Sequence, residues 1–167
     1  METTHKPLSV FLVDDDKMYL LSLQHKLIKQ FKSINFFTFA SGEECLKNID
    51  QNPDIVVLDY YMNSEAPDAM NGLQVLKKIK SISNEIRVVM LSAQDKLDVA
   101  VDSIKAGAYE YVVKSETAFI RLQNTIKNID YTVSFNRERE KYTMWNYIVA
   151  LLILLLVGIN VLYYLKR

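Results

Sequence analysis

The sequence predicts an α/β fold in which a doubly wound, five-stranded parallel sheet lies between helices. Strand-like and helix-like stretches alternate between residues 8 and 130, and the connections between them are short. The strand-like runs are apolar without strict alternation of polar residues. Both observations are typical of parallel sheets that helices cover on both faces.

Five short runs, rich in β-branched and aromatic residues, are the predicted strands. An uninterrupted apolar run is expected where a strand is buried on both faces. In chain order the runs are LSVFLV (8–13), FFTFA (36–40), IVVL (55–58), RVVML (87–91) and YEYVV (109–113).

Between the strands, apolar residues recur every three or four positions, which predicts helices. Ser41 to Glu44 has the S-x-x-E form of a capping box at a helix start, and Gly107 ends the fourth helix. The apolar positions are Leu20, Leu23, Leu27 and Phe31; Leu46 and Ile49; Leu73, Leu76 and Ile79; Leu97, Val101 and Ile104; and Phe119, Leu122, Ile126 and Ile129.

The fifth helix has no evident end, because neither glycine nor proline occurs between Glu116 and Val157. The apolar spacing over residues 119–133 would also suit a homodimer seam. It spans only about two heptads, fewer than a convincing coiled coil needs. We therefore favour packing of this stretch on the sheet.

The stretch TMWNYIVALLILLLVGINVLYYL, which begins at Thr143, contains no charged residue. A helix of about 20 apolar residues spans a bilayer core, and aromatic residues suit the two interfaces. The sequence thus predicts a membrane protein with a single transmembrane helix over 144–165, after a helical linker over 131–143 and before a tail at 166–167. A helix buried in an oligomer is the alternative, but this stretch has almost no polar face.

Composition narrows the classes of function. Lysine plus arginine and aspartate plus glutamate number 20 each, so no excess charge favours nucleic acid. Cys45 has no partner for an internal disulfide, and without a secretory signal we expect residues 1–143 in the cytoplasm. His5 and His25 lack partners at zinc-ligand spacing.

Polar residues follow the predicted strands at one edge of the sheet. Asp14 and Asp15 come after the first strand, Asp59 after the third, Ser92 after the fourth and Lys114 after the fifth. Ligands of such sheets bind beyond the carboxyl ends of the strands. Adjacent carboxylates disfavour mutual ionisation, so a cation, a helix N-terminus or both are expected beside the aspartates.

Four motifs resemble those of the response-regulator receiver domain: VDDD at 13–16, LDYYM at 58–62, MLSA at 90–93 and YVVK at 111–114. The resemblance extends from residue 8 to about 130 and includes the separations between motifs. It implies a flavodoxin-like sheet with strand order 2-1-3-4-5, in a receiver domain that we place over residues 1–130.

By this resemblance Asp59 is the phosphoacceptor, and a histidine kinase, a histidine phosphotransfer protein or a small donor supplies the phosphoryl group. The resemblance also implies Mg²⁺ held by Asp15, Asp59 and the backbone carbonyl of Tyr61, with Asp14 acting mainly through bound water. Asp16 matches no ligand of the family and is expected to cap the first helix.

The same resemblance implies a switch. Lys114 would pair with one phosphoryl oxygen and the Ser92 hydroxyl would hydrogen-bond another. Movement of Ser92 would leave room for Tyr111 to turn inward and would repack the nearby surface, as a population shift. The expected output is interaction with a downstream protein partner at the membrane, rather than enzymatic turnover.

The sequence departs from the family pattern in three ways. The loop over residues 60–72 is longer than usual, has Asn63 where proline is common, and adds Glu65 and Asp68. The lysine precedes Ser115 instead of a proline in a cis peptide bond, so this turn is either trans or strained. In place of a DNA-binding or enzymatic output domain, we expect the continuing helix and the predicted membrane span after residue 130.

Two alternatives to a phosphorylated receiver stay open. The first is a scaffold that keeps the fold without being phosphorylated. The second is a phosphatase of the haloacid dehalogenase type, whose D-x-D motif Asp14 and Asp16 would match. Met18, where threonine or valine is usual, and the absence of a role for Asp59 argue against the phosphatase.

Overall fold

The computed structural model describes residues 7–62, 69–93 and 96–165, without the side chains of residues 137, 138, 140, 141 and 159–164. His5 and the loop residues Asn63, Glu65 and Asp68, singled out in the sequence, lie outside the described residues.

Within the described residues, five strands form one sheet in which every neighbouring pair is parallel. Their order is β2-β1-β3-β4-β5, which confirms the predicted topology. The strands are β1 (Leu8–Val13), β2 (Ile34–Phe39), β3 (Ile55–Asp59), β4 (Arg87–Ser92) and β5 (Glu110–Val113).

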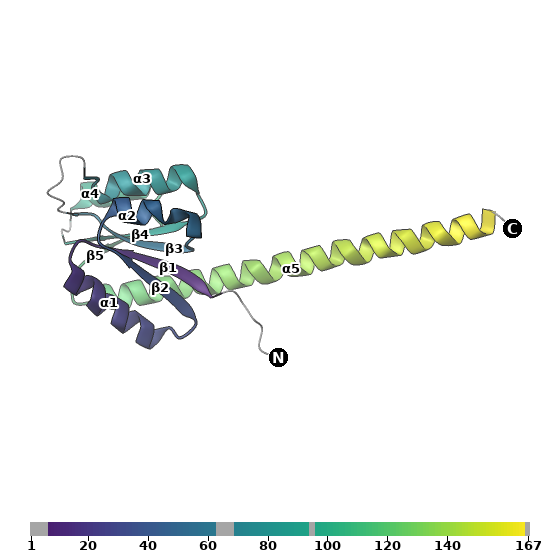
Figure 1. The fold of residues 1–167 in the computed structure, drawn as a ribbon, viewed down its shortest axis with the longest axis horizontal. Helices are drawn as coiled ribbons and strands as arrows, with labels where there is room; N and C mark the ends of the chain where they lie inside the picture. The colour runs from purple at the N-terminus through teal and green to yellow at the C-terminus, as the bar shows by residue number, and fades with distance from the viewer. Residues whose placement is uncertain (1–6, 63–68, 94–95, 166–167) are drawn as a thin grey trace. The chain divides into compact units, whose positions relative to one another are not determined.

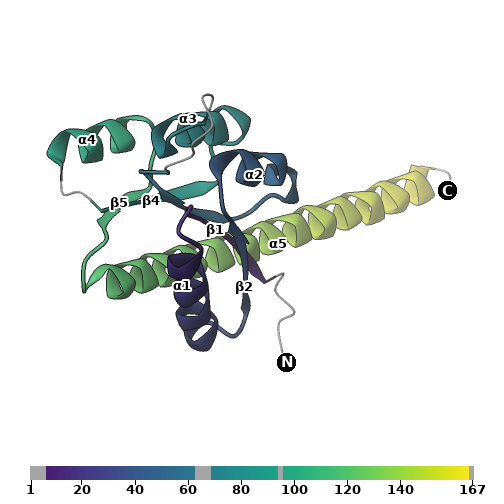
Figure 2. The same ribbon diagram turned by 60° about the vertical axis from the view of Figure 1, so that its left-hand side comes forward.

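Helices cover both faces of this sheet. Figures 1 and 2 show α1 and the first part of α5 on one face, and α2, α3 and α4 on the other. The helices are α1 (Lys17–Gln30), α2 (Gly42–Lys47), the short 3₁₀ helix η1 (Ile49–Gln51), α3 (Gly72–Ile82), α4 (Leu97–Lys105) and α5 (Ala118–Leu165).

The three central strands β1, β3 and β4 are buried on both faces, as their unbroken apolar runs predict, whereas the edge strands β2 and β5 are only partly buried. All five residues of β3 are buried, and five of the six residues of β1 are buried. The main apolar cluster joins alternate strand residues to α2 and α3, and includes Phe11, Val56, Leu58, Val88, Met90, Val75, Leu76 and Ile79. The sheet is therefore a rigid platform for the residues that follow its strands.

Side-chain caps place the helix starts near the ends of the strands. Asp16 accepts hydrogen bonds from the backbone N–H groups of Met18 and Tyr19, at 2.9 and 3.0 Å, which confirms its predicted role as N-cap of α1. Ser41 caps α2 by accepting from Glu44 N. The Glu44 carboxylate accepts from Ala40 N, so the reciprocal contact lies one residue before the predicted one.

The apolar spacing of α4 predicts the helix but not its buried face. Leu97 and Ile104 are 77% and 51% exposed, and Val101 is also exposed. The buried residue of this helix is Ser103, whose hydroxyl donates to the carbonyl of Val99. Burial of a small hydroxyl costs little when its hydrogen bond is made within the helix, so periodicity alone does not identify the covered side.

Helix α5 continues without interruption, as the absence of glycine and proline over its first forty residues indicates. Leu122, Ile126, Ile129 and Val133 are buried, which confirms the preference for core packing over a dimer seam. In the part of the chain that the structure describes, no buried apolar side chain follows Val133. Residues 1–127 and 128–167 form two separate compact units.

The transmembrane helix predicted over residues 144–165 is not supported. Among the described residues, no helix has an apolar stretch long enough to cross a membrane. The structure does not describe the side chains of residues 159–164, which form part of the predicted span. Large apolar side chains from Met144 to Val157 are exposed.

Candidate acidic site

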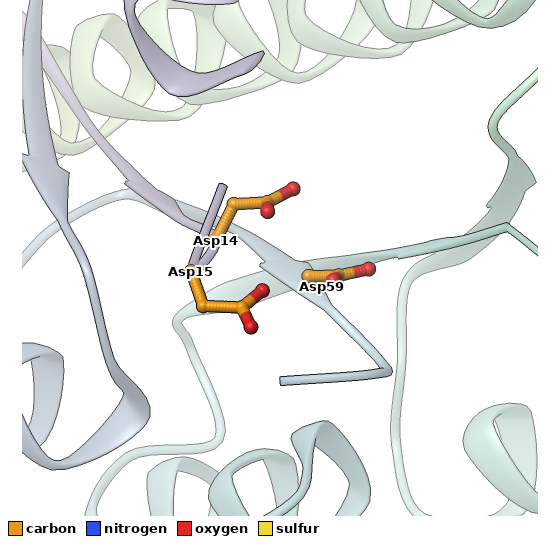
Figure 3. Close-up of side chains that lie close together, drawn as sticks. All are labelled: Asp14, Asp15 and Asp59. Carbon is orange, nitrogen blue, oxygen red and sulfur yellow. The ribbon is translucent and has the colours of Figure 1, made fainter. Parts of the chain in front are cut away.

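Three aspartates meet at the carboxyl edge of the sheet. Asp14 and Asp15 directly follow β1, and Asp59 is the last residue of β3, the neighbouring strand. One carboxylate oxygen from each lies within 4.8 Å of the others. Figure 3 shows the three carboxylates pointing to the same side of the sheet edge. The predicted convergence of these residues is thus present.

Backbone hydrogen bonds fix the positions of the buried aspartates. Asp14 Oδ1 accepts from Asp16 N at 2.9 Å, and Asp14 N donates to Phe39 O at 3.2 Å. Beyond Asp59, Tyr60 N donates to Leu91 O at 2.8 Å and so continues the pairing of β3 with β4. The site is therefore built on strand ends rather than on a free loop, which favours a fixed geometry.

Lys114 lies between two of the carboxylates. Its Nζ donates to Asp14 Oδ2 at 2.6 Å and is 3.1 Å from Asp59 Oδ1. Its backbone N–H donates to Ser92 O at 2.7 Å, which places the side chain beyond the end of β5. Burial alone would lower the pKa of Lys114, but the hydrogen bond to Asp14 and the charge of Asp59 raise it above the usual value. The ammonium is therefore held in its charged form.

Asp59 is 3% exposed, and one of its oxygens is poorly satisfied. Lys114 Nζ is near enough to Oδ1 for an ion pair, but no described residue donates a hydrogen bond to this oxygen. Burial, with the charges of Asp14 and Asp15, raises the pKa of Asp59 to about 6, although Lys114 opposes the rise. The site therefore has less positive charge than its carboxylates require.

The donor set fits a hard divalent cation. Carboxylate and carbonyl oxygens are the ligands that Mg²⁺ prefers, and Asp14, Asp15 and Asp59 supply such oxygens without a nitrogen or sulfur ligand in the same group. The unsatisfied Asp59 oxygen is a position that a cation would serve. That the backbone carbonyl of Tyr61 is a further ligand stays a prediction. The ring of Tyr61 packs edge-on against the ring of Tyr60, with centroids 4.7 Å apart.

The two predicted switch residues lie on the strands next to the site. Ser92 is fully buried at the end of β4 and pairs with Val113, the residue before Lys114. Tyr111 lies on β5 opposite Met90, and its partly buried side chain packs against the main apolar cluster. Their movement on phosphorylation stays a prediction.

The structure shows the conformation of the turn at Lys114 and Ser115, where the family commonly has a cis proline. No cis peptide bond occurs in the described residues, so Lys114 and Ser115 are joined in trans. The trans form is the expected one before a residue that is not proline. The lysine still reaches both carboxylates, and the missing proline therefore does not displace it.

Sequence reasoning missed Tyr19, whose ring lies beside the lysine. Lys114 Nζ is 4.6 Å from the centroid of this ring. Burial raises the pKa of the Tyr19 hydroxyl, partly opposed by the charge of Lys114. Tyr19 lies four residues before Leu23 and can be taken for one more core position of α1, and no motif marks it. Only the reach of the Lys114 side chain to the end of β1 brings the ring and the ammonium together.

Sequence reasoning also missed Glu43 and Gly72, which shape the loop after β3. Glu43 Oε1 accepts from Met70 N at 2.8 Å, and this hydrogen bond lowers the pKa of Glu43. Gly72 N donates to Tyr60 O at 3.0 Å, and a Cβ at Gly72 would lie 2.2 Å from the carbonyl oxygen of Asp59. A glycine just before a helical run is the signal that would have suggested a close backbone approach.

Comparisons with known proteins agree with this architecture. The response regulator receiver domain family matches residues 10–127. The transcriptional regulatory protein PrrA of Mycobacterium tuberculosis is 33% identical over 106 residues, which are 63% of this chain and 42% of PrrA. The chemotaxis protein CheY of Bacillus subtilis is 29% identical over 105 residues, 63% of this chain and 83% of CheY.

A solved structure is similar to the same region. The response regulator TrrA of Thermotoga maritima, in complex with Mg²⁺ and a beryllium fluoride, is 28% identical with a TM-score of 0.62. The match covers 73% of this chain and 98% of that one. The chain spans less than half the length of PrrA and most of CheY. With fold, acidic site and family match in agreement, the chain belongs to the response regulator receiver domain family.

Proposed function

We propose that this chain is a phosphorylation switch of a two-component pathway, with Asp59 as the phosphoacceptor. The observation that carries the proposal is the buried Asp59 carboxylate, next to two further aspartates and to a lysine held between them. A histidine kinase or a histidine phosphotransfer protein would supply the phosphoryl group. The chain itself would turn over no substrate.

Phosphoryl transfer would take place at the Asp59 carboxylate. One carboxylate oxygen forms a bond to phosphorus, while the bond from phosphorus to the donor's leaving group breaks and the electron pair departs with that group. The product is an aspartyl phosphate. Lys114 stays protonated throughout and meets the negative charge of the phosphoryl oxygens.

The carboxylates of Asp14, Asp15 and Asp59, with the carbonyl of Tyr61, would hold Mg²⁺. When bound, this ion neutralises the charge that accumulates as one anion accepts a phosphoryl group from another. The cluster geometry supports this assignment, as does the similar TrrA structure in complex with Mg²⁺. In the described structure Asp16 is engaged as a helix cap, which argues against a D-x-D phosphatase site.

The output of the switch would be a change in binding to a downstream protein. Once a phosphoryl oxygen is available, the Ser92 hydroxyl would hydrogen-bond it, and Tyr111 would repack inward. Such a change needs a coupling free energy of only ~1–3 kcal/mol between site and surface. The position of Ser92 next to the lysine along the sheet edge supports this route.

We further propose that α5 attaches the receiver to a membrane, with the receiver domain on the cytoplasmic side. Support comes from the uncharged run of residues 143–165 and from the exposed apolar side chains of residues 148–157. Exposed apolar surface of this extent marks an interaction site. Co-flotation of the full chain with phospholipid vesicles tests this part of the proposal.

Phosphorylation is tested with acetyl phosphate and Mg²⁺ on the full chain. We expect incorporation of a phosphate that survives acid and is released by hydroxylamine, as an acyl phosphate should be. Asp59→Ala should abolish it, whereas Asp98→Ala, at an exposed acid of α4, should not. Labelling that persists in Asp59→Ala would place the acceptor elsewhere. Absence of both labelling and Mg²⁺ binding in the natural sequence would favour a scaffold.

A further inference from the structure

The ammonium of Lys114 has a third neighbour besides the two carboxylates. Tyr19, in the first turn of α1, presents its ring with the centroid 4.6 Å from Nζ, inside the range of about 6 Å for a cation–π contact. The Tyr19 backbone is itself fixed, because its N–H donates to the Asp16 cap at 3.0 Å. The ring is half-buried, so its face is partly shielded from water.

We propose that Tyr19 is a positioning residue that holds the Lys114 ammonium where it meets the phosphoryl group. The consequence for phosphorylation rests on the proposed function; the positioning itself does not. A lysine ammonium is a strongly hydrated charge on a flexible four-carbon stem. An aromatic face attracts the cation while it excludes water from one side. The ring thereby restricts the movement of the lysine side chain and uses no carboxylate oxygen to do so.

The contact matters most after Asp59 has changed its charge. In the unphosphorylated site Lys114 is held by Asp14 at 2.6 Å and by Asp59 at 3.1 Å. Phosphorylation converts the charged Asp59 carboxylate into an acyl phosphate whose negative charge lies on the phosphoryl oxygens, whereas the Tyr19 ring is chemically unaltered. Asp14 and the ring would then be the neighbours that keep the ammonium in place beside the new phosphoryl oxygens.

A different role for Tyr19 would be to fill space at the start of α1, where its ring is half-buried. The two roles predict different results for two substitutions. Tyr19→Phe keeps the aromatic face and loses only the hydroxyl, whereas Tyr19→Leu keeps an apolar side chain and loses the face. Positioning requires the phenylalanine variant to behave like the natural sequence and the leucine variant to differ. Space filling predicts small and similar effects.

The geometry is tested directly by NMR of the full chain without a donor. Aromatic ring currents should shift the Lys114 ε-methylene protons upfield, and the resonance is assigned by its disappearance in Lys114→Met. We expect Tyr19→Phe to retain the shift and Tyr19→Leu to lose it. Retention of the shift in Tyr19→Leu would overturn the proposed contact, whatever the outcome for phosphorylation.

The effect on phosphorylation is measured with acetyl phosphate at saturating Mg²⁺. We expect Tyr19→Leu to lower the rate constant about tenfold, the size that a desolvated cation–π contact supports. Tyr19→Phe should restore the rate, and Met18→Ala, at a 76% exposed neighbour, should leave it unchanged. In a Lys114→Met background, Tyr19→Leu should change the remaining rate less than twofold.

Mg²⁺ affinity separates positioning from general damage to the site. The described contact of Tyr19 in the site is with Lys114, and Tyr19 supplies none of the three carboxylates of the acidic cluster. Calorimetric Mg²⁺ affinity should therefore be equal in the natural sequence and in both Tyr19 variants. The positioning role would be overturned if Tyr19→Leu were phosphorylated as fast as the natural sequence. It would also be overturned if Tyr19→Leu lowered the rate by the same factor in the Lys114→Met background as in the natural sequence. If the natural sequence accepts no phosphoryl group, the proposed function fails, and the NMR result still decides the positioning.

Discussion

At the scale of single residues, Asp59 is a carboxylate whose burial weakens the fold when no cation neutralises it. Burial, followed by the charges of Asp14 and Asp15, raises its pKa to about 6, against an ordinary value of 3.8. Because the folded pKa exceeds the unfolded one, the folded state binds this proton more tightly. The free energy of unfolding should therefore fall as pH rises from about 4 to about 6.

This linkage predicts that Asp59→Asn stabilises the protein in a metal chelator at pH 7.5. The gain should be on the order of 3 kcal/mol, since each pKa unit is about 1.4 kcal/mol, and it should shrink toward pH 4. Urea unfolding at the two pH values measures it. Added Mg²⁺ should stabilise the natural sequence more than the variant. An Asp59→Asn protein that is less stable at pH 7.5 would contradict the assignment.

Lys114 provides a second prediction, because its ammonium occupies the space between two buried carboxylates. Lys114→Met should lower stability in a chelator by about 3–5 kcal/mol, the cost of breaking a buried ion pair. Mg²⁺ affinity should rise, since a competing cation is removed, while phosphorylation slows. Calorimetry with Lys105→Met, at an exposed position of α4, as the control measures the affinity. Weaker Mg²⁺ binding in Lys114→Met would be the opposite result.

The acidic residues and the lysine could be predicted from the sequence because each follows a recognisable strand. In a parallel sheet the carboxyl ends of all strands lie at the same edge, so residues that follow the strands meet there. Tyr19 and Glu43 lie on helices, and their roles depend on how those helices pack beside the site. Spacing along the chain carries no information about that packing, so these residues could not be found.

At the scale of elements, the start of α3 is packed directly against the end of β3. Gly72, the first residue of α3, leaves no room for a side chain, because its Cβ would lie 2.2 Å from Asp59 O and 2.8 Å from Tyr60 Cα. Both contacts are backbone atoms, which cannot rotate away. The position of α3 and that of the phosphoacceptor are therefore coupled.

We expect Gly72→Ala to destabilise the receiver domain by about 2 kcal/mol or more, as overpacking against fixed atoms does. It should also weaken Mg²⁺ binding, because Asp59 must shift. Gly158→Ala is the matched control, since nothing lies within 4 Å of a Cβ there. That change should leave the receiver's thermal transition unaltered. Equal melting temperatures for the two variants would show that α3 can move away from β3 without a loss of stability.

Elements were predictable to different degrees for physical reasons. The central strands β1, β3 and β4 carry a strong signal because both of their faces are buried, and the observed bounds of all five strands lie close to the predicted runs. In α4 the apolar side chains Leu97 and Ile104 are exposed, while Ser103 is buried. Periodicity reports that one side of a helix is apolar; whether the sheet or something else covers that side is a tertiary property.

At the scale of the whole molecule, one uninterrupted helix belongs to both compact units. Residues 118–127 of α5 lie in the first unit and residues 128–165 in the second. Every buried apolar side chain in the described residues lies at or before Val133. The part of α5 beyond this point therefore contributes apolar surface without contributing to a described core.

Truncation after Asn136 should separate these contributions. We expect Mg²⁺ binding, acetyl phosphate labelling and the melting temperature to stay as in the full chain, because no described buried side chain is lost. Flotation with phospholipid vesicles should disappear. Truncation after Lys127, which also removes the buried Ile129 and Val133, should lower stability by about 3 kcal/mol or more. Flotation that survives removal of residues 137–167 would contradict membrane attachment through α5.

The hydrogen bonds around the β3–α3 connection have a consequence for how such a protein can diversify. Tyr60 is hydrogen-bonded to β4 and to Gly72, and Met70 is hydrogen-bonded to Glu43. Both ends of the connection are therefore held by bonds that do not involve the residues between them. The entropy of closing a longer span grows only slowly with its length. Extra residues can therefore be accommodated there without disturbing the scaffold, which makes this connection a suitable place to graft a reporter peptide.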